Sequence, residues 1–196
     1  MLTGVWTAGI ATFALKTWQR QAKAKKQTDF LDELTDSVQE FVTHISRPIS
    51  EVRFLMMSIE SHANTMQLEQ NLENPEAVAY IKRQGLEDAK RLLNSLEPCT
   101  AAMVKINALV IKGSVFDLKN YSECEHTCMI LDAQLGRIQA LCHVIGSPSL
   151  NWENPKVQQT LSAVLQISAP DLTEQIIQLR AHYIAFVKKN YASVYS

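Results

Sequence analysis

The chain has 196 residues, of which 46% are hydrophobic and 20% charged, proportions that exclude wholesale disorder and fit a folded globular protein. Its six glycines and six prolines are too few for the many turns of a sheet protein, which favours long helices. The net charge of −1 hides an asymmetry, because residues 1–26 hold five basic and no acidic residues, whereas the remainder holds 14 basic and 20 acidic ones, a net −6.

The chain opens with an uncharged apolar segment that predicts a membrane anchor. The residues expected to contact lipid are Leu2, Val5, Trp6, Ile10, Phe13, Leu15 and Trp18. The 14 residues before the first charge extend about 21 Å as a helix, and a snorkelling lysine lengthens residues 1–18 to about 27 Å, enough for a thinned bilayer. A basic flank follows, formed by Lys16, Arg20, Lys23, Lys25 and Lys26. In this sequence the basic residues follow the apolar run. That order is typical of a membrane anchor with a cytoplasmic flank, whereas a secretory signal peptide has its basic residues first.

We therefore expect residues 1–18 to be a single-pass anchor in a bacterial inner membrane, with the basic flank on lipid headgroups and the body in the cytoplasm. Two alternatives stay open for this segment: a buried core helix, or an amphipathic helix in the membrane interface. Gly4, Ala8 and Thr12 form a row of small residues that would let two anchors pack closely.

The junction between the two regions reads Ala14-Leu15-Lys16-Thr17-Trp18-Gln19-Arg20-Gln21-Ala22-Lys23. It resembles the anchor-to-body junction of uncharacterised bacterial single-pass membrane proteins with a helical cytosolic region. The resemblance covers roughly the first 35 residues and implies location only, since that group has no assigned activity. Its members usually have a longer apolar run, so this anchor is shorter than the pattern or its true start lies upstream.

The body reads as helices separated by proline and Asn-Pro sequences. The first seam alternates spacings of three and four: Leu31, Leu34, Val38, Phe41 and Ile45. Its helix is compatible with continuation from the anchor, and Pro48 is expected to break or kink it. A second seam follows: Ile49, Val52, Met56, Ile59, Ala63 and Met66. Residues 67–74 are expected to end that helix and form a loop.

Asn74-Pro75-Glu76 predicts the next helix start, with Asn as cap and Pro at the first helical position. The seam expected there is Ala89, Leu93, Leu96, Thr100, Met103, Asn107 and Val110. Pro98 predicts a kink within it, and Gly113 a left-handed stop.

The most regular stripe comes next and ends at Gly146. Its members are Tyr121, Cys124, Cys128, Leu131, Leu135, Ile138, Cys142 and Ile145. Asn154-Pro155 then opens a shorter helix, and Pro170 interrupts it. Asp171 and Glu174 have capping-box spacing for a last helix. The apolar face of that helix is Leu172, Ile176, Leu179, Tyr183 and Phe186.

These patterns predict an all-α protein, with an anchor helix (1–18) continuing into an antiparallel helical bundle or long helical hairpins (19–196). Amphipathic helices joined by short loops bury their stripes only against each other. Seams of this spacing also suit an intermolecular coiled coil, so a homo-oligomer or a protein partner is expected.

The sequence offers few candidate metal-binding residues. Cys124 and Cys128 share a helix face, but His126 lies about 200° around from the first of them, so the three do not converge. Two thiolates are too few for a closed zinc site, and we expect the four cysteines, Cys99 and Cys142 included, to be apolar core residues. Glu123-x-x-His126 has the spacing of di-iron bundles, but no second such pair occurs.

No catalytic or cofactor motif emerges from the remaining residues. His44, His62, His143 and His182 are scattered, and nucleophile-elbow, phosphate-loop and dinucleotide patterns are absent. We expect no metal, cofactor, small-molecule substrate or nucleic-acid partner, the last because the acidic body repels a polyanion.

The favoured function is a non-enzymatic, membrane-anchored bundle acting through protein–protein interaction or self-assembly. The alternative is a soluble helical metal-binding or redox protein using Cys124 and Cys128. A third hypothesis, an effector that perturbs membranes, rests on the proximity of anchor and bundle.

Overall fold

A computed structural model describes residues 3–62 and 72–194, with side chains described from residue 14 onward and up to residue 61 in the first range. In these ranges every regular element is a helix, which confirms the all-α prediction. The elements are α1 (Thr3–His62), α2 (Pro75–Tyr80), a π-helical turn η1 (Ile81–Gly85), α3 (Leu86–Gly113), α4 (Tyr121–Ile145), α5 (Pro155–Leu165) and α6 (Ala169–Val194).

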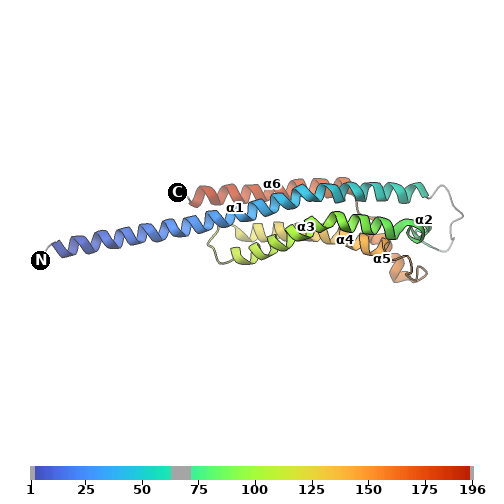
Figure 1. Ribbon diagram of the computed structural model, residues 1–196, viewed down its shortest axis with the longest axis horizontal. Helices are drawn as coiled ribbons and strands as arrows, with labels where there is room; N and C mark the ends of the chain where they lie inside the picture. Colours follow the sequence, from blue (N-terminus) through green and yellow to red (C-terminus); the bar gives the residue numbers. More distant parts are fainter. Residues whose placement is uncertain (1–2, 63–71, 195–196) are drawn as a thin grey trace.

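Four long helices form the bundle (Figure 1). Helix α1 packs on α3, α3 on α4, α4 on α6, and α6 back on α1, so the contacts close a ring. Each helix runs antiparallel to its neighbours in the ring (Figure 1), as expected when amphipathic helices are joined by short connections. Short helix α5 packs on α4 at one end. The predicted antiparallel bundle is confirmed.

Helix α1 is one uninterrupted helix of 60 residues. The prediction that Pro48 breaks it is wrong, because the helix continues through this residue. Pro48 lies on the buried side, next to the core residue Ile49 and one turn from Val52. Packing of these neighbours holds the helix together where proline removes one backbone hydrogen bond. Ala63, Met66 and most of the expected loop at 67–74 lie outside the described residues.

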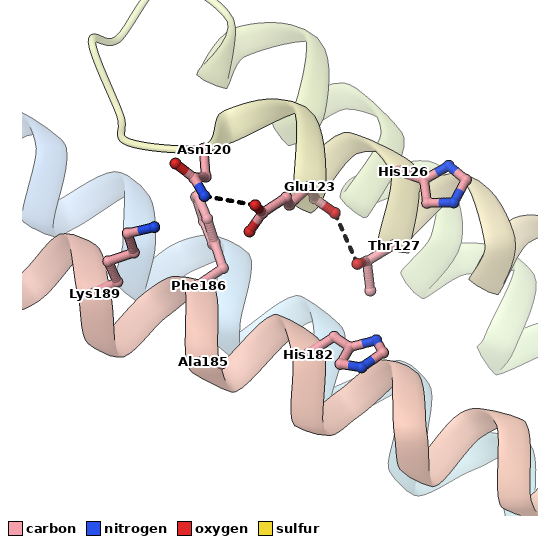
Figure 2. A pocket seen from close by; sticks show the side chains of 8 residues that line it. All are labelled: Asn120, Glu123, His126, Thr127, His182, Ala185, Phe186 and Lys189. Atoms are coloured by element: carbon pink, nitrogen blue, oxygen red, sulfur yellow. Dashed lines mark hydrogen bonds between the residues drawn. The ribbon is translucent and has the colours of Figure 1, made fainter.

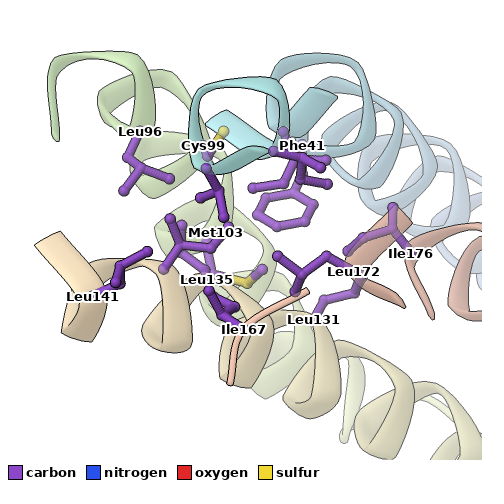
Figure 3. Packing of buried hydrophobic residues seen from close by; sticks show 14 of the residues in the cluster. Phe41, Leu96, Cys99, Met103, Leu131, Leu135, Leu141, Ile167, Leu172 and Ile176 are labelled. Atoms are coloured by element: carbon purple, nitrogen blue, oxygen red, sulfur yellow. The ribbon is translucent and has the colours of Figure 1, made fainter. Parts of the chain in front are cut away.

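The predicted seams of α1, α4 and α6 form the core. The seam of α1 from Leu31 to Ile45 is at most 2% exposed, and the stripe of α4 from Cys124 to Ile145 at most 3%. Figure 3 shows side chains from all four helices meeting at one centre, among them Phe41, Met103, Leu135 and Leu172. Heptad spacing therefore identified these three buried faces correctly.

The predicted register of α3 is partly wrong. Leu93 is 37% exposed and Asn107 lies at the surface. Positions that the prediction left out are buried in their place: Leu92, Cys99, Ala102, Ile106 and Leu109. Helix α3 packs on both α1 and α4, so its buried face is wider than a two-position seam and is centred one residue away. Pro98 lies within this continuous helix, at its exposed surface.

Some of the predicted helix caps are present and others are not. Asn154 caps α5, its side chain accepting a hydrogen bond from the Lys156 amide at 2.9 Å. Asn74 precedes α2 as predicted but makes no capping bond, and instead donates to Ser162 Oγ at 2.8 Å. The capping pair at Asp171 is wrong, because Ser168 Oγ accepts from the Asp171 amide at 3.4 Å.

Gly113 ends α3, but not in the left-handed conformation that was predicted. Among described residues only Asn120, at the start of α4, has a positive φ, 57°. Glycine is needed at position 113 for space: an added Cβ would lie 2.1 Å from the Tyr121 hydroxyl and 2.4 Å from the Phe30 ring.

A second close approach occurs where α3 and α4 meet at the end of the bundle. A Cβ added at Gly85 would lie 2.2 Å from the carbonyl oxygen of Ile145. This oxygen belongs to the backbone, so a change of side-chain rotamer cannot relieve the clash. At Gly136 on α4, by contrast, an added Cβ meets nothing within 4 Å.

We predict that Gly85→Ala lowers the free energy of unfolding by about 1–3 kcal/mol, because the new methyl group forces α3 and α4 apart. Gly136→Ala is the matched control and should raise it by about 0.5–1 kcal/mol, since alanine stabilises a helix and fills only solvent here. Urea unfolding followed by circular dichroism measures both. A stabilised Gly85→Ala variant would contradict the predicted close contact.

Candidate functional site

The predicted membrane anchor lies in the first part of α1. Along the described residues, no helix has an apolar stretch long enough to cross a bilayer. The spanning anchor and the single-pass inner-membrane location are therefore wrong. The physical reason is length: the apolar run has 14 residues before Lys16, whereas a spanning helix needs about 20. Leu2 lies outside the described residues, and Val5, Trp6, Ile10 and Phe13 belong to the helical backbone of α1.

The segment instead forms a projecting helix, which we call the arm (residues 3–26 of α1). Figure 1 shows this part of α1 extending alone beyond the other helices of the bundle. Side chains 14–21 are exposed, Leu15 by 53% and Trp18 by 65%. Among the side chains described, which begin at residue 14, Gln27 is the first that is buried. A tryptophan this exposed is uncommon on an unbound protein surface.

The base of the arm is held to the bundle by the loop between α3 and α4. Lys23 Nζ lies 2.6 Å from Asp117 Oδ2, and hydrogen bonding to this ammonium holds the pKa of Asp117 below its usual range. The rings of Phe30 and Phe116 pack with centroids 5.1 Å apart. The other four basic residues of the predicted flank, Lys16, Arg20, Lys25 and Lys26, form no ion pair with the described acidic residues.

That loop is in turn fixed to α6 by a buried amide that sequence analysis missed. Asn190, 2% exposed, accepts a hydrogen bond from the Lys119 amide at 2.7 Å and donates to the Lys119 carbonyl at 3.0 Å. It also donates to Phe186 O at 3.0 Å. Asn190 sits on the buried face of α6, one turn after Phe186, where a polar residue in an apolar stripe is the signal that could have revealed it.

A groove runs along the surface between α4 and α6 (Figure 2). It consists of two adjoining hollows of about 470 Å³ and 320 Å³ that share His126, Thr127 and His182. Lys189 and Glu123 line one end of it. The polar groups do not converge on one point: Glu123 Oε1 accepts from Asn120 at 2.5 Å, and the two imidazoles lie apart along the groove (Figure 2). No sequence spacing links His126 to His182, so only the fold places them on the same side.

The four cysteines are buried thiols without a disulfide. Burial raises the pKa of Cys99 to about 11 and that of Cys142 to about 12. Cys124 and Cys128 are at most 1% exposed, and the hydrogen bond between them, together with burial, raises the pKa of Cys124. Neutral, inaccessible thiols are poor nucleophiles and poor ligands.

The remaining candidate ligands stay apart. Glu123 and His126 are exposed on α4, and His44, His143 and His182 are exposed on three different helices. The side chain of His62 lies outside what the structure describes. Within the described ranges, no three histidine, cysteine or carboxylate side chains cluster to hold a metal ion. The metal-binding alternative therefore has no ligand set in this part of the chain.

A polar network that sequence analysis did not predict joins α1 to α3. Arg91 Nε contacts Glu51 Oε2 at 2.7 Å, and Arg91 Nη2 contacts Asp88 Oδ1 at 2.8 Å. The hydroxyl of the buried Tyr80 donates a hydrogen bond to Asp88. Burial is the main cause, and this hydrogen bond the second, of the raised pKa of Tyr80. The network is structural, since each polar group in it already has a partner.

Comparison of the chain with protein-family models, with curated proteins and with solved structures finds no match.

We predict that the native protein resists thiol labelling at pH 8. The thiolate is the reactive form. A raised pKa keeps Cys99, Cys124 and Cys142 neutral, and burial covers all four thiols. Labelling with a chromogenic disulfide should be at least about 100-fold slower than in denaturant, where all four thiols react. Rapid native labelling of Cys124 or Cys128 would contradict this and revive the redox alternative.

Proposed function

We propose that this protein works through protein–protein contact, with the arm of α1 as its recognition element and the four-helix bundle as the base that holds it. The observation that carries the proposal is the exposure of Leu15 and Trp18 on a helix that has left its bundle. The expected membrane-spanning role is no longer available to this segment, but its apolar and basic composition still needs a complementary surface.

The arm is suited to recognition because α1 supplies its backbone order in advance. An isolated helix of about 24 residues is only marginally stable in water, since nucleation is costly. Here the helix is nucleated inside the bundle, where the seam from Leu31 to Ile45 is buried, and the arm continues it. A preformed helix loses less conformational entropy on binding than a flexible tail.

The composition of the arm indicates the chemistry of its partner. An apolar run followed by Lys16, Arg20, Lys25 and Lys26 fits an apolar surface bordered by carboxylates, the helix-in-groove mode of recognition. Trp18 is the best candidate for an energetic hot spot, because tryptophan dominates such interfaces.

A photocrosslinking amino acid in place of Trp18 tests this proposal in cells that naturally produce the protein. We expect a crosslinked protein of one discrete mass, which is lost when the charge-reversed arm K16E/R20E/K25E/K26E carries the same crosslinker. Affinity of the purified pair should fall at least about tenfold in Trp18→Ala, the cost of losing a hot-spot contact.

Ile177 on α6 is a matched control site, since it is also apolar and exposed, by 62%. A crosslinker there should not capture the same protein. Exclusive crosslinking to lipid at position 18, with sedimentation of the purified chain on anionic vesicles, would contradict a protein partner. Equal capture from positions 18 and 177 would also contradict it, because capture would then reflect exposure alone.

A further inference from the structure

The outer side of the α3–α4 pair carries an exposed apolar surface, which we call the α3–α4 wall. On α3 the aliphatic side chains of Val104 and Ile111 are 66% and 75% exposed, and Val115 just beyond the helix is 78% exposed. On α4, Met129 is 60% exposed. Val104, Ile111 and Val115 are spaced seven and four residues apart, so they lie on one side of α3 and are not scattered over its surface.

Two hydrogen bonds fix how α3 and α4 align along this wall. Asn107 Nδ2 donates to Asp132 Oδ2 at 3.4 Å, and Gln139 Nε2 donates to Thr100 Oγ1 at 3.3 Å. The two residue numbers add to 239 in both pairs, so Gly136 of α4 lies level with Met103 of α3, one residue before Val104. An added Cβ at Gly136 meets nothing within 4 Å. Gly136 therefore leaves the surface beside Val104 open to a docking side chain.

The charge of the wall is acidic. Glu97 lies two turns before Val104 on α3, and Glu125 and Asp132 lie about one turn on either side of Met129 on α4, all at exposed positions. Lys112, by contrast, lies with its Nζ 3.3 Å from Glu33 of α1, and Lys105 precedes it by two turns. An apolar surface with acidic neighbours attracts an apolar helix with basic neighbours. The groove between α4 and α6 lacks this complementarity, because Lys189 and two histidines line it.

We infer that the arm of one copy of this protein docks on the α3–α4 wall of a second copy. The inference deepens the proposed function, on which it rests, by naming the partner of the arm. Charge complementarity supports it: Lys23 pairs with Asp117 of its own bundle, and the other four basic residues of the arm complement the three carboxylates of the wall.

The arm cannot reach the wall of its own bundle, because it leaves the bundle as a straight continuation of α1 (Figure 1). A contact with a second copy has no such restriction. If two copies exchange arms, the contact closes as a dimer, and the apolar surfaces of both arms and both walls are covered.

Analytical ultracentrifugation of the full chain tests the inference with complementary variants. The arm variant W18E/R20E and the wall variant V104E/I111E should each remain monomeric at concentrations where the unchanged chain self-associates, with dissociation constants raised at least about 100-fold. Mixed in equal amounts they should form a one-to-one complex, because one variant keeps an intact wall and the other an intact arm.

Two further variants keep the test independent of folding defects. Gly136→Arg adds a long cationic side chain to the wall at a position where a Cβ meets nothing within 4 Å, so it should weaken association at least about tenfold while the circular dichroism spectrum stays unchanged. Ile177→Glu, at an exposed apolar position away from the wall, should leave association unaffected.

The outcomes separate this inference from the proposed function. A chain that stays monomeric at high concentration, while position 18 still crosslinks to a different protein, overturns the inference and leaves the proposed function standing. Self-association that is lost in the wall variant but kept in the arm variant also overturns it, because the wall would then bind something other than the arm.

Discussion

Helix α1 is the element on which the structure depends, because its buried seam faces both α3 and α6. The seam of this helix lies in the core from Leu31 to Val52 and continues through Leu55 and Ile59. Helices α3 and α6 both pack against α1. The same seam keeps the backbone helical through Pro48, where local propensity alone would favour an interruption. Tertiary packing therefore keeps α1 helical along its buried part.

The consequence for function is a rigid projection. Because α1 is helical before it leaves the bundle, the arm needs no packing of its own to remain a helix over its first exposed turns. The ion pair of Lys23 with Asp117 and the stacked rings of Phe30 and Phe116 fix the point of departure. Asn190 fixes the loop that carries Phe116 and Asp117. Cations and exposed apolar side chains are thus presented at a defined distance from the bundle, a geometry that suits recognition better than catalysis.

The sequence was most informative for helices whose buried residues form one narrow apolar face. The centres of the buried faces of α4 and α6 could be predicted, since each alternates spacings of three and four without a gap, but flanking core residues such as Leu141 and Val187 were not. Helix α3 was harder, because it packs on two neighbours, and hydropathy does not distinguish Leu92 in the core from Leu93 at the surface. The space required at Gly85 and the alignment of His126 with His182 depend on contacts between distant segments, which no local pattern records. The apolar N-terminal run was correctly seen as exceptional, but its length favours a projecting helix over a spanning one.

The central claim is that α1 is one straight helix whose arm projects from the bundle, and a distance between its two exposed ends tests it most directly. Spin labels at positions 18 and 57, which replace exposed side chains, are separated by 39 helical residues. Double electron–electron resonance on labelled protein diluted with unlabelled protein should give one narrow distance near 58 Å. A broad distribution, or a distance below about 45 Å, would show that the arm unfolds or folds back on the bundle, and would contradict this account.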